Sequence, residues 1–177
     1  MRKIIYYVAS SIDGFIAGPQ GDISSFNTTG NGVDQYLVDL QAFDTVIMGR
    51  ETYEFGYKFG VKPGMPAYNH MEHFIFSKTL TFENSHEKVH VFPPDLQLVK
   101  DLKDQEGSAI YLCGGGIVAG WLLKNKMIDE LKIKLNPFIQ GEGIRLFGNY
   151  IEQVPMLLLD SNGYENGLQI LEYKIIY

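Results

Sequence analysis

The short apolar segment from Ala109 to Cys113 runs directly into three glycines, Gly114 to Gly116, which are followed by the apolar segment from Ile117 to Leu123. This pattern predicts a buried strand, a tight turn and a helix. Glycine has no Cβ and lets a ligand approach the backbone, while the free N–H groups at the start of the helix attract anions. We therefore expect a phosphate-binding turn, with a nucleotide or dinucleotide as its ligand.

A second glycine turn follows another predicted strand. The apolar segment from Thr45 to Met48 is followed by Gly49-Arg50-Glu51-Thr52, which is typical of a turn into a short helix. A ligand that lies across the carboxyl edge of a sheet needs such turns at more than one strand end. We therefore expect the two turns to form two sides of one binding site.

Length and composition limit the class of protein. We expect residues 1–177 to form one domain, because this length is typical of single domains. The formal net charge of −6 favours a small-molecule partner and no nucleic acid. Cys113 is the only cysteine, which excludes an internal disulfide framework and indicates a cytoplasmic protein. No apolar stretch approaches the roughly 20 residues that cross a bilayer, so we expect no membrane association.

Strand and helix patterns alternate along the first part of the chain, whereas its end is all strand. Further strands are predicted at 3–9, 73–76, 89–92 and 131–136, and helices at 33–43 and 95–105. The glycine-bearing stretch 10–32 is predicted to be a long functional loop. The segments 156–161 and 168–176 flank Asn-Gly pairs and predict an antiparallel hairpin. This order predicts an α/β fold with a mixed, mostly parallel sheet, helices on both faces and an antiparallel edge.

Four segments, in this order, resemble the dihydrofolate reductase superfamily, and most closely the stand-alone relatives of the reductase domain of riboflavin biosynthesis, the RibD C-terminal domain. They are Ala9 to Ala17 with its Asp13-Gly14 pair, Val46 to Glu54, Phe74 to Lys78, and Cys113 to Gly143. The resemblance implies a three-layer dihydrofolate reductase-like fold and a homodimer. It also implies an oxidoreductase that uses NADPH to reduce a pyrimidine- or pterin-like heterocycle, as 5-amino-6-(5-phosphoribosylamino)uracil reductase and dihydrofolate reductase do.

The resemblance also implies which residues hold the cofactor. The two glycine turns would clasp its phosphates, and Ser77 and Lys78 would meet the adenosine 2′-phosphate, where a hydroxyl and a cation are suitable groups. The loop at Ile16 and Ala17 would cover the nicotinamide, and Ala9 would form its floor. The complete set is Ala9, Ile16, Ala17, Gly49, Arg50, Glu51, Thr52, Ser77, Lys78, Gly114, Gly115, Gly116, Ile117 and Val118.

A reductase of this kind also needs a proton for the reduced bond, and a carboxylic acid near the substrate is the expected source. Dihydrofolate reductases place an acid early in the helix before the second strand, and Asp34 lies close to that position. Asp13 is the alternative, because it borders the same site. Asp34 equally suits the first turn of a helix, and Asp13-Gly14 equally suits an ordinary turn.

The sequence departs from the resembling families at two positions. Trp121 is the only tryptophan and follows the glycines, whereas dihydrofolate reductases usually carry one in the nicotinamide loop. Phe15 stands where the riboflavin-pathway domains usually have a lysine. Both departures argue against adopting either family's substrate unchanged. Aromatic residues that are candidates for a slot around a flat heterocycle are Phe26, Tyr53, Tyr57, Phe59 and Tyr68.

Two other functions fit the residues. The stretch from Gly114 to Ala119 matches the dinucleotide fingerprint of a conventional NAD dehydrogenase. A nucleotide-binding module without turnover is the second alternative. We expect no metal site, because His70 and His73 are not accompanied by a further cluster of cysteines or histidines.

Overall fold

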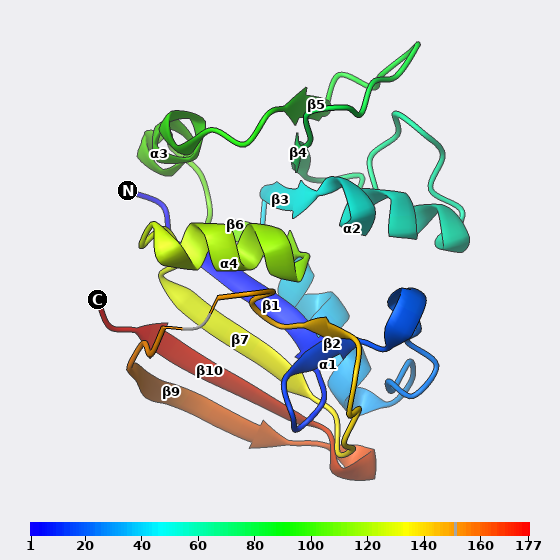
Figure 1. Ribbon diagram of the computed structural model, residues 1–177, viewed down its shortest axis with the longest axis vertical. Helices are drawn as coiled ribbons and strands as arrows, with labels where there is room; N and C mark the ends of the chain where they lie inside the picture. The colour runs from blue at the N-terminus through cyan, green and yellow to red at the C-terminus, as the bar shows by residue number, and fades with distance from the viewer. Residues whose placement is uncertain (151) are drawn as a thin grey trace.

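The fold is built around an eight-stranded mixed sheet, seen in the computed structural model of the chain, which describes residues 1–150 and 152–177 (Figure 1). The strand order is β5-β4-β3-β6-β1-β7-β10-β9. Neighbours from β5 to β7 are parallel, and β10 is antiparallel to both β7 and β9. The strands are β1 (Ile4–Ser10), β3 (Thr45–Gly49), β4 (Glu72–Phe76), β5 (Val89–Phe92), β6 (Ile110–Gly114), β7 (Glu130–Leu135), β9 (Met156–Gly163) and β10 (Gln169–Ile175).

Helices cover both faces of the sheet, which gives the predicted three layers (Figure 1). The helices α3 (Leu96–Asp104) and α4 (Gly116–Lys124) pack on one face, and α1 (Asn31–Leu40) packs on the other. Successive residues of a strand point to opposite faces. Tyr6 of β1 therefore belongs to the core under α4, and Tyr7 belongs to the core under α1. The α/β fold with a C-terminal antiparallel hairpin is confirmed.

Local sequence signals account for most element boundaries. The carboxylate of Asp95 accepts a hydrogen bond from Gln97 N at 2.8 Å and caps α3, as its position predicts. Trp121 packs edge-on against Phe76, with 5.5 Å between the ring centroids, and so belongs to the core. The helix α1 begins at Asn31 rather than Val33, because the chain turns at Gly30, whose φ of 104° favours glycine.

The stretch between β1 and α1 is more ordered than a simple loop. It contains β2 (Phe15–Ala17) and a 3-10 turn at Pro19–Gly21, neither of which was predicted. The strand β2 pairs with β8 (Ile144–Arg145), so this early part of the chain is joined to a segment about 130 positions later. A glycine is required at Gly143, where a Cβ would overlap the carbonyl oxygen of Ala17.

The parallel strands end at one edge of the sheet, where β6 lies between β1 and β3. The connection after β1 therefore passes over β6 before it enters β3. Ligands of open α/β sheets bind at such reversals of strand order, outside the carboxyl ends of the strands. The turns after β3 and β6 both lie at this edge.

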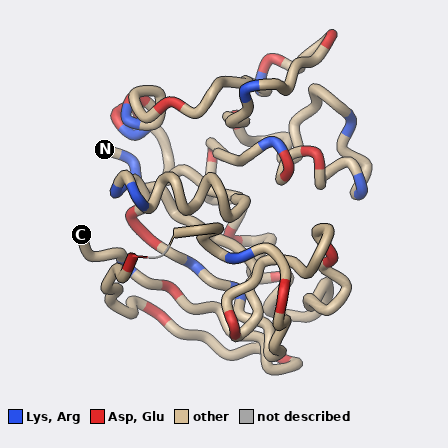
Figure 2. Tube along the Cα trace, in the orientation of Figure 1, with Lys and Arg blue, Asp and Glu red and all other residues tan. Residues whose placement is uncertain are grey.

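Among the described residues, none of the helices is long and apolar enough to cross a membrane. Figure 2 shows lysine and arginine positions spread over several elements, including α3, α4 and β7, rather than gathered in one of them.

Candidate functional site

The two predicted glycine turns lie side by side. Met48 pairs with Gly114 across β3 and β6, which places the turn after each strand next to the other. A methyl group on Gly49 would lie 3.0 Å from Cγ2 of Val118. A methyl group on Gly115 would lie 3.1 Å from Oγ1 of Thr52. The structure therefore brings together the residues from Gly49 to Thr52 and from Gly114 to Val118.

Both turns lead into helices that begin without a side-chain cap. Gly49 precedes α2 (Arg50–Phe55) and Gly115 precedes α4, and neither makes a capping bond with a side chain. The first helical hydrogen bond of α4 runs from Ala119 N to Gly115 O at 3.0 Å. The N–H groups of the preceding helical residues therefore lack an acceptor within the helix. Such groups, with the positive end of the helix dipole, suit an anionic ligand.

The three glycines do not serve the same purpose. Gly114 has a φ of 124°, and the Gly114–Gly115 peptide is cis. A Cβ on Gly116, in contrast, would overlap the carbonyl oxygen of Arg145. Position 120 also requires a glycine, because a Cβ there would overlap the carbonyl oxygen of Phe147. The packing of the chain against α4 therefore also requires a glycine at position 116, and the expected place of Gly116 beside the cofactor stays a prediction.

The loops after β3 and β4 are joined beside the glycine turns. Gly49 pairs with Phe76, so Arg50 and Ser77 leave the sheet as neighbours. Arg50 donates from Nη1 to Thr79 Oγ1 at 3.0 Å and from Nε to the Glu54 carboxylate at 3.0 Å. This arrangement places an arginine, two hydroxyl groups and the exposed Lys78 along one short stretch of the sheet edge.

Thr79 joins this group through Arg50 and was not predicted from the sequence. The Ser77 hydroxyl accepts hydrogen bonds from the backbone N–H groups of Thr79 at 3.2 Å and Leu80 at 2.9 Å. This turn directs the chain back toward Arg50. The Ser-Lys-Thr run is the signal that was available, since hydroxyl residues of this kind favour such turns. Glu51 lies exposed in the first turn of α2.

The residues expected around the nicotinamide come from β1 and β2. Ala9 lies in the last part of β1 and is half-buried, while Ile16 and Ala17 belong to β2. The loop that holds β2 is tied down at several points: Ile12 N donates to Phe138 O at 3.0 Å, and Leu146 N donates to Gly14 O at 2.9 Å. The loop is therefore anchored to the segment 138–146 and is not a free glycine-rich lid.

Asp13 is the main anchor of this loop. Its carboxylate accepts hydrogen bonds from Gln140 N at 2.9 Å, Gly141 N at 2.8 Å and the Ser11 hydroxyl at 2.6 Å. These bonds, led by the one from Gln140, lower the pKa of Asp13 to about 2. A carboxylate held in its ionised form by three donors suits a structural role in the loop better than the donation of a proton.

Asp34 lies in the first turn of α1, as the sequence predicts, and its side chain is exposed. The residues of α1 that face the sheet are Val33, Tyr36 and Leu40. Helical geometry places Asp34 away from that face, because each residue advances the direction by about 100°. Its assignment as the proton donor stays a prediction.

A tyrosine cluster lies on the α1 side of the sheet. The hydroxyls of Tyr36 and Tyr111 are 2.7 Å apart, and the hydroxyl of Tyr68 lies 3.8 Å from Sγ of Cys113. Burial raises the pKa of Tyr36 and of Tyr111 above the usual value of a tyrosine, so both hydroxyls are neutral at physiological pH. Tyr36, Tyr111 and Cys113 had not been recognised as a group, because they are distant in sequence and meet only across the sheet.

The five aromatic residues proposed as a slot do not come together. Tyr68 joins the tyrosine cluster. Tyr53 is buried and donates its hydroxyl to Met65 O at 2.7 Å, with Tyr57 packed beside it. Phe26 packs against Phe138, and Phe59 is exposed and packs against Phe55. The slot as a whole is contradicted by the structure, because three of these rings serve local packing.

The two histidines that were considered as metal ligands, His70 and His73, form hydrogen bonds with backbone groups. His73 Nε2 accepts from the N–H groups of Ala67 and Tyr68, both at 3.1 Å, and His70 Nε2 lies 3.1 Å from Leu40 O. Within residues 1–150 and 152–177, no three side chains of the types that ligate metals are placed to hold an ion.

Comparison with known proteins agrees with this geometry. The sequence model of the RibD C-terminal domain matches residues 2–170. The chain belongs to the RibD C-terminal domain family. Members of this family are reductases that typically use NADPH. The chain is 28% identical over 172 residues to the uncharacterized protein YwjB of Bacillus subtilis, and the match covers 96% of each protein.

Solved structures show the same fold. A putative riboflavin biosynthesis protein from Shewanella sp. PV-4 superimposes with a TM-score of 0.80 at 24% identity, over the full length of both chains. A pyrimidine reductase-like protein from Corynebacterium diphtheriae superimposes with a TM-score of 0.74 at 19% identity, over 99% of this chain and 92% of that one. The dihydrofolate reductase-like fold of the RibD family is thereby established for this chain.

Proposed function

We propose that the protein is an NADPH-dependent reductase of a pyrimidine- or pterin-like heterocycle. The observation that carries this proposal is the meeting of the Gly49 and Gly115 turns at the carboxyl edge of the sheet, with Arg50 and Thr79 beside them. A dinucleotide lying across this edge would find donors for its phosphates at one end. The other end of the dinucleotide would lie against β1 and β2.

The residues present fit this cofactor. The uncapped N–H groups at the start of α4 would hold the diphosphate, and Val118 and Thr52 shape the space between the two turns. Arg50, Lys78 and the hydroxyls of Ser77 and Thr79 would bind the 2′-phosphate, which distinguishes NADPH from NADH. When bound, NADPH supplies the hydride. The chain itself aligns the two reactants and, through β2 and its anchors, excludes water.

The pyrimidine-like substrate is supported by family membership and by the pyrimidine reductase-like protein named above. Ala9 at the end of β1 would form the floor beneath the nicotinamide, and Ile16 and Ala17 of β2 would lie over it. Of the two carboxylic acids considered, Asp34 remains the candidate, because Asp13 is engaged by three hydrogen-bond donors in the loop. The exposed position of Asp34 requires that a water molecule relay the proton to the substrate.

One alternative retains specific support. Of the two acids considered as proton donors, Asp13 is held in its ionised form and Asp34 points away from the sheet, which favours a nucleotide-binding module without turnover. The conventional NAD dehydrogenase is no longer an alternative, because the family match and the fold place the glycines in a different architecture.

The proposed function is tested by following NADPH oxidation with two acceptors, a phosphoribosylaminopyrimidinone and dihydrofolate. We expect turnover with the pyrimidinone and a lower rate with dihydrofolate. NADPH binding without oxidation of the cofactor by either acceptor would favour the non-catalytic alternative. A Thr52→Val variant keeps the size of the side chain and removes the hydroxyl next to Gly115, and we expect it to weaken NADPH binding.

We further propose that the chain forms a homodimer, as the family resemblance implies, and that the two copies pair through β9. All eight residues of β9 are exposed, and Met156, Leu157, Leu158 and Leu159 keep 46 to 56% of their surface accessible. The strand lies at the end of the sheet, so one row of its backbone N–H and C=O groups has no neighbour.

Sedimentation at micromolar concentration tests this pairing. We expect a dimer for the wild-type protein and a monomer for Leu158→Lys. Leu37→Lys on α1, where the leucine is equally exposed, is the matched control and should leave the dimer intact. A wild-type monomer would contradict the proposal.

A further inference from the structure

Lys134 occupies an unusual position for a lysine. It is the next-to-last residue of β7 and retains only 8% of its surface exposed. It pairs with Ala9 of β1 on one side and with Ile170 of β10 on the other, so its side chain lies on the sheet face that α1 covers. A buried charge at such a position normally requires a partner of opposite charge.

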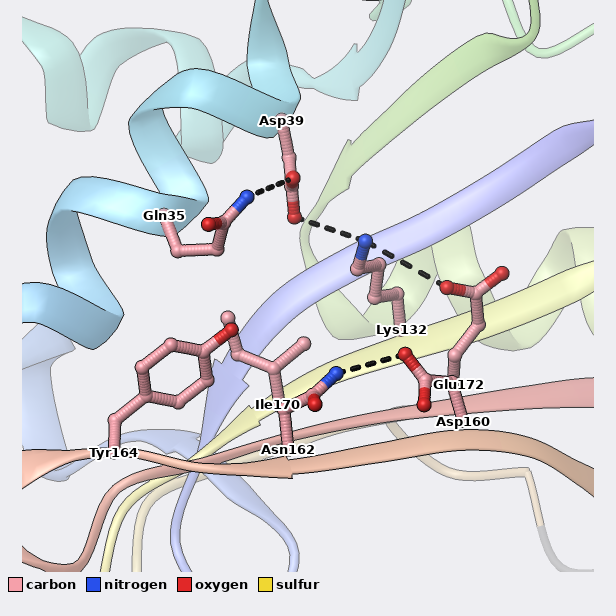
Figure 3. A pocket seen from close by; sticks show the side chains of 8 residues that line it. All are labelled: Gln35, Asp39, Lys132, Asp160, Asn162, Tyr164, Ile170 and Glu172. Carbon is pink, nitrogen blue, oxygen red and sulfur yellow. Dashed lines mark hydrogen bonds and ion pairs between the residues drawn. The ribbon is translucent and has the colours of Figure 1, made fainter.

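The neighbouring lysine has such partners. Lys132, two residues earlier on the same face of β7, contacts the carboxylates of Asp39 and Glu172 (Figure 3). The distances are 2.9 Å to Asp39 and 3.6 Å to Glu172. Among the described residues, no hydrogen bond or ion pair involves the ammonium of Lys134. Its Nζ lies instead over the ring of Tyr36, 4.8 Å from the centroid. A ring face compensates a buried ammonium less completely than a carboxylate does.

The ammonium is nevertheless within reach of a ligand. In the described part of the chain, every side-chain nitrogen or oxygen that is fully shielded from solvent has a hydrogen-bond partner. The Lys134 ammonium has none, so it must keep contact with solvent. Burial lowers the pKa of Lys134, and the side chain lies near the carboxyl edge of the sheet with little solvent around it.

Lys134 lies beside the proposed binding position of the substrate, which accepts the hydride. Ala9, its partner on β1, is the residue assigned to the floor of the nicotinamide site. Ala9 and Cys113 are only half-buried, although most of their strand neighbours are buried, and both lie toward the carboxyl edge. We propose that the Lys134 ammonium binds a negatively charged edge of the substrate ring, so that the substrate is an anionic pyrimidine-type heterocycle. This inference rests on the proposed reductase function and names the charge of its substrate.

The first test uses stability and needs no ligand. Lys134→Met and Lys132→Met make the same substitution on the same face of the same strand. We expect Lys134→Met to keep or raise the melting temperature, because it removes a cation that lacks a carboxylate partner. Lys132→Met should lower it, because Asp39 and Glu172 lose their partner. An equal loss in both variants would contradict the assignment of Lys134 as uncompensated.

The second test uses barbiturate and uracil as probes, since the two rings have nearly the same shape and only barbiturate is anionic at neutral pH. Calorimetric titrations are made with and without saturating NADPH. We expect wild-type protein to bind barbiturate at least tenfold more tightly than uracil, and Lys134→Met to lose about tenfold or more for barbiturate alone, the size of a hydrogen bond to a charged group. Lys132→Met should keep the preference.

The outcomes separate the two proposals. Equal binding of the two rings by the wild type, no binding of either ring, or an unchanged preference in Lys134→Met would each overturn the role of Lys134. Absence of NADPH binding in its own titration would overturn the reductase function, whatever the rings do. A preference for barbiturate in a protein that does not bind NADPH would show the anion site without the reductase.

Discussion

The guanidinium of Arg50 donates a hydrogen bond to the hydroxyl of Thr79 at 3.0 Å, and this bond joins the loops that follow β3 and β4. The two residues are 29 positions apart in the chain. They meet because Gly49 pairs with Phe76 at the ends of adjacent parallel strands. The bond holds a cation at the end of the proposed cofactor site where a 2′-phosphate would lie.

Removal of this cation is expected to change the choice of cofactor. Arg50→Ala and Lys78→Ala should each weaken NADPH binding about fivefold to tenfold, and leave NADH binding within about twofold, because only NADPH carries the extra phosphate. Fluorescence titration of both cofactors measures the change. The control is Lys124→Ala, at the opposite end of α4 from the glycine turn. An unchanged preference for NADPH in both variants would remove these residues from the 2′-phosphate site.

Gly116→Ala is expected to destabilise the fold by about 2 kcal/mol or more, because the added methyl group would overlap the backbone of Arg145 and cannot be relieved by a side-chain movement. Gly163→Ala is the matched control, since open space surrounds that position. Urea unfolding of both variants gives the comparison. Equal stability of Gly116→Ala and the wild type would contradict the close packing of segment 145–148 against α4.

Asp13→Asn is expected to loosen the loop rather than abolish proton transfer. The carboxylate accepts from the N–H groups of Gln140 and Gly141, so these two amides should exchange with deuterium faster in the variant. The pKa of Asp13 is lowered to about 2, so the stabilisation from its charge is complete above the ordinary value of 3.8 and is lost as the pH falls through about 2. If turnover fell a hundredfold with unchanged exchange, Asp13 would be the proton donor.

His73 is expected to make stability depend on pH. Burial lowers its pKa from 6.5 to about 4, and this effect outweighs the hydrogen bond to the Met71 carbonyl, which acts in the opposite direction. Between these values the unfolded chain takes up a proton and the folded chain does not, so stability falls as the pH drops from 6.5 to 4. One pKa unit corresponds to about 1.4 kcal/mol, which gives a total of about 3 kcal/mol.

The measurement is the free energy of unfolding of the wild type and His73→Gln at pH 7.5 and pH 4.5. The difference at pH 7.5 gives the cost of the substitution itself. The wild type should lose more stability than the variant on acidification. Parallel losses in the two proteins would place the pH dependence elsewhere.

Much of the fold could be predicted because local patterns and tertiary structure agree. The strand before Gly114, the Asp95 cap and the final hairpin each depend on neighbouring residues, and each lies where expected. The second glycine turn could also be placed, since parallel strands bring their carboxyl ends to one edge.

The features that could not be predicted from the sequence depend on contacts between segments that are distant in the chain. Position 116 requires a glycine because the backbone of Arg145 lies against it, and no local sequence pattern indicates this contact. Lys132 and Lys134 alternate with apolar residues, which is typical of a strand with one face in solvent. The structure covers that face with α1 and leaves one of the two lysines with carboxylate partners. The proposed aromatic slot failed for a related reason, because composition does not show which rings share a surface.

A thermal-shift comparison of NADPH and NADH with the wild-type protein tests the central claim most directly. A ligand that binds the native state at about 100 times its dissociation constant adds about 2.7 kcal/mol of stability, which a melting curve resolves readily. We expect NADPH to raise the melting temperature and to raise it more than NADH does, because in the proposed site Arg50 and Lys78 would bind the 2′-phosphate that only NADPH carries. An unchanged melting temperature at millimolar NADPH would contradict the account.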